Sequence, residues 1–117
     1  MPHVVLTGKA AIEDIFRELK PLFIRNKSTI LKTTEVYLER DKNAILVDSL
    51  AIEANRKTIF LAMISGRDHG VVVRLYPKIE VEKTVGVRKI LAELAKQLIA
   101  AFPGLRIGET NLDDYLR

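Results

Sequence analysis

The chain of 117 residues contains no cysteine. This absence excludes disulfide bonds, thiolate zinc sites and cysteine nucleophiles, and it fits a reducing compartment. Long apolar runs are also absent, since no stretch reaches the ~20 residues that a membrane-spanning helix needs. The N-terminal residues MPHVVLTGKA show no basic segment followed by an apolar one, so no signal peptide is predicted. We therefore expect a cytoplasmic protein without a membrane segment.

Histidine is scarce, and positive charge is spread out. The two histidines, His3 and His69, cannot form a conventional metal site alone, so we expect neither a metal nor a cofactor. The net charge of +4 is compatible with a nucleic-acid partner, but lysine and arginine are dispersed from Lys9 to Arg117 without a dense basic run. This dispersion favours a solvated surface of mixed charge, with nucleic acid kept as an alternative partner.

What the chain does contain is typical of one globular domain, with 48% hydrophobic and 29% charged residues. Apolar side chains alternate through the middle of the chain, which predicts strands, and they recur at helical spacing near Ile12 and after Thr84. Pro21 and Pro103 end the two helical patterns. The predicted strands are 3–6, 30–40, 44–53, 58–65 and 71–76, and the predicted helices are 10–20 and 85–102. Residues 78–83 and 105–108 are expected to be extended, and 112–117 to form a last turn.

The expected architecture is a single α+β domain over residues 1–117, with a core of 1–104 and a short C-terminal tail of 105–117. The order is strand, helix, four strands, helix, and the short loops between strands demand antiparallel pairing. We expect a four- to five-stranded antiparallel sheet with two helices packed on one face. This arrangement resembles that of TATA-box-binding-protein-like domains over residues 3–102. The resemblance concerns the fold alone, contains no motif and implies no function.

The predicted register gives the sheet two different faces. An even-numbered loop pairs Val36 with Val47, because a one-residue slip would put glutamates among the apolar side chains. The next hairpin is expected to pair Asp48 with Met63. One face is almost purely apolar and should receive the helices; it carries Val36, Leu38, Ile45, Val47, Ala51, Phe60, Ala62, Ile64, Val71, Val73 and Leu75. The open face has an aliphatic middle with polar groups around it; it carries Thr33, Glu35, Tyr37, Leu46, Asp48, Leu50, Ile52, Ile59, Leu61, Met63, Val72, Arg74 and Tyr76.

An exposed apolar patch of this kind usually marks a binding surface. Something other than the two helices must cover the open face: a second copy of the chain, the C-terminal tail, a partner or an apolar ligand. A homodimer is the favoured solution, because symmetric self-association is common. The residues expected to contact a ligand or a second copy are Glu35, Tyr37, Asp48, Leu50, Leu61, Met63, Arg74 and Tyr76.

Three polar groups on the open face allow some chemistry. Glu35 is expected opposite Asp48, where two like charges need a shared proton, a metal or a nearby cation. Arg74 is expected opposite Leu61, from where its long side chain reaches Asp48. Either these groups form an acid pair or an arginine anchor for a polar ligand, or they form an ion pair inside an interface, and the second alternative is favoured. A single β-bulge would remove the whole arrangement.

Two loops contain residues that occur in active sites. SGRDHG (65–70) places Asp68 beside His69, but it lacks a GxSxG elbow and its glycines suit a hairpin turn. LTGKAA (6–11) is similar to the end of a phosphate-binding loop, but it lacks the upstream glycine and the hydroxyl that holds magnesium. We predict a plain turn, a plain strand-to-helix connection and no catalytic residue.

These observations favour a non-catalytic binding or assembly module that self-associates or binds a ligand through the open face. An enzyme is not the favoured class, although the residues do not exclude one. Two alternatives stay open: a nucleic-acid-binding module, and a small enzyme or ligand carrier with an acidic and arginine-containing pocket on the sheet.

Overall fold

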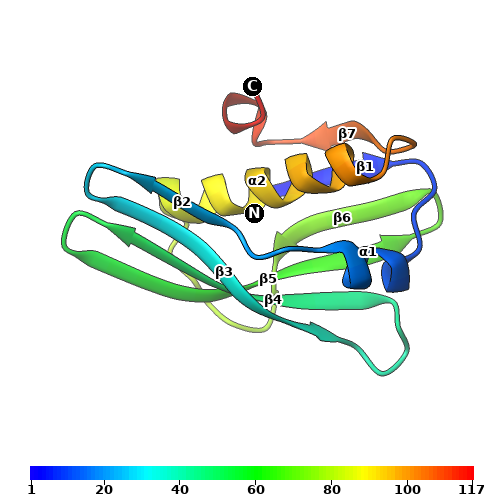
Figure 1. Cartoon of the computed structure of the whole chain (residues 1–117), viewed down its shortest axis with the longest axis horizontal. Helices are drawn as coiled ribbons and strands as arrows, with labels where there is room; N and C mark the ends of the chain where they lie inside the picture. Colours follow the sequence, from blue (N-terminus) through cyan, green and yellow to red (C-terminus); the bar gives the residue numbers. More distant parts are fainter.

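The computed structural model describes all 117 residues (Figure 1). The chain forms seven strands, two α-helices and one short 3-10 turn. The strands are β1 (His3–Thr7), β2 (Phe23–Asn26), β3 (Thr29–Leu38), β4 (Ala44–Glu53), β5 (Arg56–Arg67), β6 (Gly70–Leu75) and β7 (Arg106–Thr110). The helices are α1 (Ile12–Glu18) and α2 (Val85–Ala101), and the 3-10 turn is η1 (Asp113–Tyr115). All strands join one antiparallel sheet in the order β2-β3-β4-β5-β6-β1-β7.

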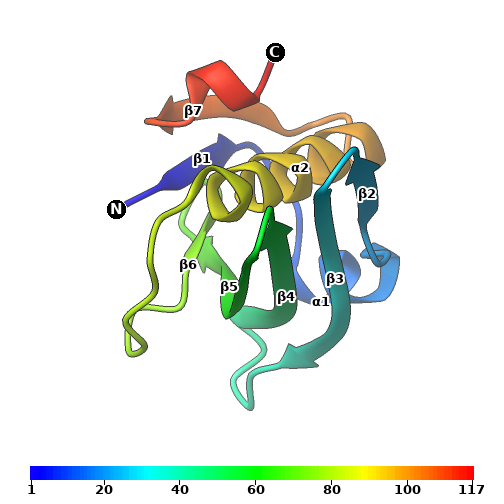
Figure 2. The same cartoon turned by 90° about the vertical axis from the view of Figure 1, so that its left-hand side faces the viewer.

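The sheet curls into a half-barrel around α2 (Figure 2). The hydroxyl of Thr84 begins this helix by accepting a hydrogen bond from the backbone N–H of Val87 at 3.1 Å. The apolar stripe of α2, which includes Ile90, Leu91 and Leu94, is buried against the inner face of the sheet. Burial of each such side chain contributes about 1.5–3 kcal/mol. The predicted apolar face of the sheet is confirmed as the face that receives α2.

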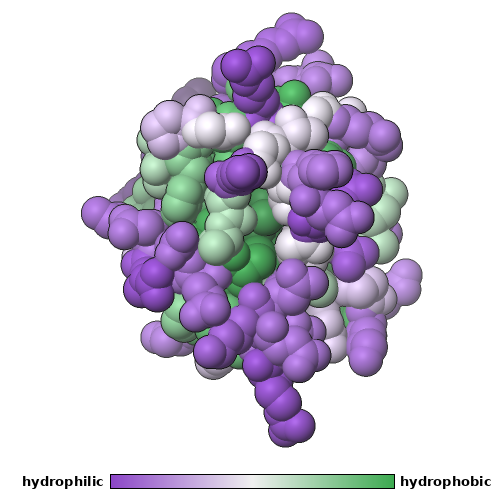
Figure 3. All heavy atoms as spheres, turned by 90° about the vertical axis from the view of Figure 1, so that its right-hand side faces the viewer, coloured by the Kyte–Doolittle hydropathy of each residue, from purple (hydrophilic) through white to green (hydrophobic).

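Helix α1 closes one end of the half-barrel, at the right in Figure 1. Its side chains Ile12 and Ile15 are buried in the same core as α2. The helix ends at Glu18, because the N–H of Leu19 makes the last helical bond, to Ile15, and Pro21 follows shortly. Figure 3 views this end of the molecule and shows a band of hydrophobic surface between hydrophilic residues. Both helices therefore lie on one side of the sheet, as expected.

The sheet has seven strands rather than the predicted four or five. The sequence pattern predicts no element over the residues of β2, and it predicts only a short extended piece of the tail, 105–108, near β7. Both are edge strands of only four and five residues with mostly exposed side chains, so their sequences lack the alternation that marks a half-buried strand. Residues 78–83, expected to be extended, form no strand.

The predicted register is confirmed near the turn of the β3–β4 hairpin and wrong in the next two hairpins. Val36 pairs with Val47, as expected. Asp48 pairs with Leu61 rather than Met63, and Arg74 pairs with Met63 rather than Leu61. The cause is the position of the turns, which are the residue pairs 54–55 and 68–69. A shift by two residues keeps every side chain on its predicted face, so the pattern of apolar residues cannot detect it.

The C-terminal tail extends the sheet and covers the helix side. Strand β7 pairs with β1 at one edge, and Leu112 is buried in the core beside α2. The side chain of Thr110 donates a hydrogen bond to the carbonyl oxygen of His3 at 2.7 Å and fixes this edge. The tail therefore leaves uncovered the face of the central strands that is turned away from α2, which we call the outer face.

Candidate functional site

The outer face of strands β4, β5 and β6 carries neither helix nor tail. Its side chains are only half-buried, although many are apolar, and Ile59 is 70% exposed. A face of a sheet that packs against nothing is normally polar. This face is therefore the strongest candidate for a functional surface, and it divides into an aliphatic half and a charged half.

The aliphatic half lies toward the hairpin that joins β4 to β5. Cross-strand pairs place its side chains together, because Ile30 faces Ile52 and Leu50 faces Ile59. Neighbouring β-branched and aliphatic residues on one side of a sheet form a continuous apolar surface. We call this surface the aliphatic patch; it consists of Ile30, Leu50, Ile52, Ile59 and Leu61. Lys32 pairs with Leu50 and Lys57 pairs with Ile52, so both lysines lie at the rim of the patch. Asp48 pairs with Leu61.

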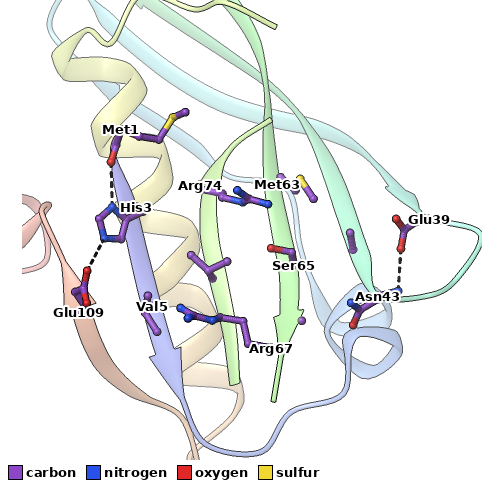
Figure 4. Close-up of a pocket in the computed structure, with 13 residues that line it drawn as sticks. Met1, His3, Val5, Glu39, Asn43, Met63, Ser65, Arg67, Arg74 and Glu109 are labelled. Carbon is purple, nitrogen blue, oxygen red and sulfur yellow. Dashed lines mark hydrogen bonds and ion pairs between the residues drawn. The ribbon is translucent and has the colours of Figure 1, made fainter. Parts of the chain in front are cut away.

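The charged half is hollowed into a groove of about 670 Å³ (Figure 4). Its floor is formed by strands β1, β6 and β5, with α2 behind them, and its two rims come from β7 and from the loop between β3 and β4. We call it the Arg74 groove. Its lining includes Met1, His3, Val5, Glu39, Asn43, Met63, Ser65, Arg67, Val72, Arg74 and Glu109.

Arg74 is the central charge of this groove. It faces Met63 on one side and His3 on the other, and its guanidinium extends toward Met63 (Figure 4). None of the ion pairs in the molecule includes Arg74, and its Nε is buried without a hydrogen-bond partner. The expected ion pair with Asp48 is therefore not formed.

Asp48 has a different partner. Its carboxylate accepts a hydrogen bond from the phenol of Tyr37 at 3.2 Å. The charge of Asp48 raises the pKa of Tyr37 above its ordinary value, the hydrogen bond adds to this effect, and the charge of Glu35 contributes least. The pair belongs to the boundary between the aliphatic patch and the charged half.

The region around Glu35 corrects two expectations. Strand β3 contains a β-bulge between Thr33 and Val36, so Thr34 and Glu35 together lie opposite Asp48. The expected one-to-one pairing of Glu35 with Asp48 is therefore replaced by the bulge. The same bulge turns Thr33 to the inner face, where it is buried and its hydroxyl accepts a hydrogen bond from the N–H of Leu22 at 2.8 Å.

An apolar hollow of about 230 Å³ adjoins the Arg74 groove. Its walls include Tyr37, Leu46 and Tyr76, and it shares Met63 with the groove. Of the predicted contact residues, Arg74 and Met63 thus line the groove, Tyr37 and Tyr76 line the hollow, and Leu50 and Leu61 belong to the aliphatic patch. The structure brings these predicted residues onto one surface but separates them into three neighbouring parts.

Sequence reasoning missed the groove residues that come from the two ends of the chain. His3 and Glu109 lie on β1 and β7, and the Nε2 of His3 is 3.8 Å from the Glu109 carboxylate. Their meeting depends on β1 lying between β6 and β7. No local motif near either residue indicates this, so only the strand order could have identified them.

The two loops that contain residue types found in active sites form a hairpin turn and a strand-to-helix connection. Asp68 and His69 form the turn of the hairpin between β5 and β6, where Gly70 has a φ of 141° and a side chain would collide with the carbonyl oxygen of Leu6. The N–H of Gly8 donates a hydrogen bond to the carbonyl oxygen of His69 at 3.0 Å. Both segments thus match the predicted turn and connection.

The molecule contains no cluster of three or more histidine, aspartate or glutamate side chains placed to hold a metal ion. None of its helices is long and apolar enough to cross a membrane. The chain matches no protein-family model, no curated protein and no solved structure. No comparison therefore supports the expected likeness to TATA-box-binding-protein-like domains.

Proposed function

We propose that this protein is a non-catalytic binding module that assembles into a homodimer through the aliphatic patch. The observation that carries the proposal is that Ile59 is exposed and its aliphatic neighbours are only half-buried on a face that neither helix nor the C-terminal tail covers. Exposed apolar surface of this kind is stabilised by burial against a partner. The lack of cysteine suits such a module in a reducing cytoplasm.

A second copy of the chain fits the rim of the patch. In a two-fold contact the same surface meets itself, so each rim charge faces a residue from the other copy. The patch has Lys32 and Lys57 at one side and Asp48 at another. A rim with both signs can pair its own cations with the anions of the second copy, which favours self-association over a strongly charged partner.

Light scattering over a range of protein concentrations tests the dimer. Ile59→Lys places a charge in the patch at a side chain that is already 70% exposed, so the fold should survive. We expect the wild-type chain to have the mass of a dimer and Ile59→Lys that of a monomer. Ile107→Lys is the matched control, because Ile107 is an exposed isoleucine on β7 outside the patch. A monomeric wild-type chain at all concentrations would refute the proposal.

The Arg74 groove supports a second candidate function, the binding of a small ligand beside the dimer contact. Nucleic acid has less support, because Glu35, Glu39 and Asp48 lie on or beside the outer face and would repel phosphates. Titration of single-stranded and double-stranded oligonucleotides at low and high salt distinguishes the two. An affinity for oligonucleotides that falls steeply with salt would favour nucleic acid. We expect no binding of either oligonucleotide.

A further inference from the structure

We propose that the Arg74 groove binds the anionic group of a small amphipathic molecule, whose apolar part lies in the adjoining hollow. The inference depends on the proposed function only in taking the outer face as a binding surface. It names the ligand class: a carboxylate on an aliphatic or aromatic body.

The first support is the unpaired charge of Arg74. An arginine is charged at every physiological pH, and a partly buried charge is unfavourable unless a counter-charge and acceptors stabilise it. No carboxylate of the chain pairs with Arg74, and its buried Nε has no acceptor. The groove contains a second arginine, Arg67, that is also absent from every ion pair. An anion in the groove would supply the missing counter-charge.

The second support is the charge of the rims, which selects a singly charged group. Glu109 lies beside His3 on one rim, and Glu39 accepts a hydrogen bond from the N–H of Asn43 on the other. Two carboxylates near the entrance would disfavour a doubly charged phosphate more than a carboxylate. A carboxylate also matches the planar donor fork of a guanidinium.

The third support is the continuity between groove and hollow. Met63 lines both, and the guanidinium of Arg74 extends toward it (Figure 4). From that point the hollow leads between Tyr37, Leu46 and Tyr76, which are apolar over most of their surface. A molecule with its carboxylate on Arg74 would therefore bring its apolar body over Met63 into the hollow. Burial of that body would supply most of the affinity.

The site does not coincide with the proposed dimer contact. On β5 the groove is lined by Met63 and Ser65, whereas the aliphatic patch contains Ile59 and Leu61. The two regions are neighbours along the same strand. Ligand binding and self-association can therefore be measured separately on one sample.

Isothermal titration calorimetry with three probes tests the inference. Octanoate has both the anionic group and the apolar chain, 1-octanol has only the chain, and acetate has only the anionic group. We expect octanoate to bind saturably at one site per chain. 1-Octanol should bind at least about tenfold more weakly, since the charge-assisted hydrogen bonds are lost, and acetate should show no saturable binding.

The Arg74→Met variant tests whether Arg74 binds the anionic group. It should weaken octanoate binding by about tenfold or more and leave 1-octanol binding unchanged. Arg25→Met is the matched control, because Arg25 is an exposed arginine on β2, at the sheet edge far from the groove. If Arg74→Met does not fold, Arg74→Lys keeps the charge and removes the planar fork, and it should also weaken octanoate.

Three results would overturn the inference: no saturable octanoate binding to the wild-type chain, equal affinities for octanoate and 1-octanol, or full octanoate affinity in a folded Arg74 variant. Light scattering on the same samples distinguishes failure of the ligand proposal from failure of the dimer proposal. A dimer that does not bind octanoate refutes the ligand and leaves the proposed self-association standing. A monomer that binds octanoate through Arg74 refutes the dimer and leaves the ligand site standing.

Discussion

The phenol of Tyr37 and the carboxylate of Asp48 are joined by a hydrogen bond of 3.2 Å across strands β3 and β4. The side chains are diagonal neighbours, since Tyr37 pairs directly with Leu46. Asp48 is the acid that was expected to pair with Arg74, but it faces Leu61 and bonds Tyr37 instead. None of the ion pairs in the chain includes the Arg74 guanidinium, which makes the Arg74 groove a candidate site.

The Tyr37–Asp48 pair predicts a late-titrating tyrosine. Because the negative charge of Asp48 disfavours the phenolate, the pKa of Tyr37 is raised. Asp48→Asn should return the pKa of Tyr37 to its ordinary value of about 10. The measurement is tyrosinate absorbance during an alkaline titration. Tyr37→Phe should remove the same late-titrating signal, whereas Tyr115→Phe should leave it in place.

The same shift has a defined sign for stability. A phenol whose pKa is raised in the folded chain is stabilising in its neutral form. The contribution of Tyr37 should be fully present below the unfolded pKa and should be lost as the pH rises through the folded value. Denaturant unfolding of wild type and Asp48→Asn at neutral and alkaline pH tests this. The free energy of unfolding of the wild type should fall relative to that of Asp48→Asn as the pH rises through this range. A wild-type value that rises relative to the variant would contradict the assignment.

The close contact between Gly86 and Glu53 predicts that replacing Gly86 lowers the stability of the fold. The N–H of Gly86, in the first turn of α2, donates a hydrogen bond to Glu53 Oε1 at 2.7 Å, and a Cβ on Gly86 would lie 2.7 Å from the Glu53 carboxyl carbon. Gly86→Ala should therefore lower the free energy of unfolding by about 1–3 kcal/mol, although alanine favours helices. Denaturant unfolding measures the loss.

Two further variants test the cause. In a Glu53→Ala background the clash with the carboxyl group is removed and only the contact with the Cβ of Ala51, at 3.0 Å, remains, so Gly86→Ala should cost less than in the wild-type chain. Gly104→Ala is the control, since a Cβ there would make only an ordinary van der Waals contact, 3.9 Å from the carbonyl oxygen of Lys9, and it should change stability by no more than about 0.5 kcal/mol. Equal losses from Gly86→Ala in both backgrounds would show that Glu53 is not responsible.

Thr33 should be structurally important although it was expected on the open face. Its hydroxyl accepts a hydrogen bond from the N–H of Leu22, and its own N–H donates to the carbonyl oxygen of Leu22 at 3.0 Å. Thr33→Val has nearly the same shape but leaves the N–H of Leu22 unpaired, so it should cost about 1–3 kcal/mol of stability. Thr34→Val, at the exposed neighbour, should have little effect in the same unfolding experiment. The reverse order would place Thr33 on the outer face after all.

Gln97 should fasten the end of α1 to α2. Its side-chain oxygen accepts a hydrogen bond from the N–H of Lys20 at 2.7 Å, and its side-chain nitrogen donates to the carbonyl oxygen of Lys20 at 3.1 Å. Gln97→Met keeps the length and removes both bonds, so we expect a loss of about 1–3 kcal/mol and faster hydrogen exchange at Lys20. Lys89→Met, on the exposed face of α2, is the control. Unchanged exchange at Lys20 would exclude the fastening role.

The amino-acid pattern was sufficient for most of the fold. Alternation over two residues predicted β3 to β6 and the inner face of the sheet, because a strand has one side in the core and one outside. The pairing of Val36 with Val47 was predictable, since a one-residue slip would have buried glutamates. Thr84 was predictable as the cap of α2 because its hydroxyl accepts the hydrogen bond of a free N–H in the first turn.

The sequence by itself therefore determined the two helices, the strands β1 and β3 to β6, the core and the existence of an open, semi-apolar face, all of which follow from local periodicity. Only the tertiary structure decided how that face is divided. The turn at 68–69 sets Arg74 opposite Met63, a two-residue difference that leaves the pattern of faces unchanged. The bulge before Val36 turns Thr33 inward, and β1 brings His3 between β6 and β7 to meet Glu109. These features depend on pairing between segments far apart in the chain, where no local spacing of residues carries a signal.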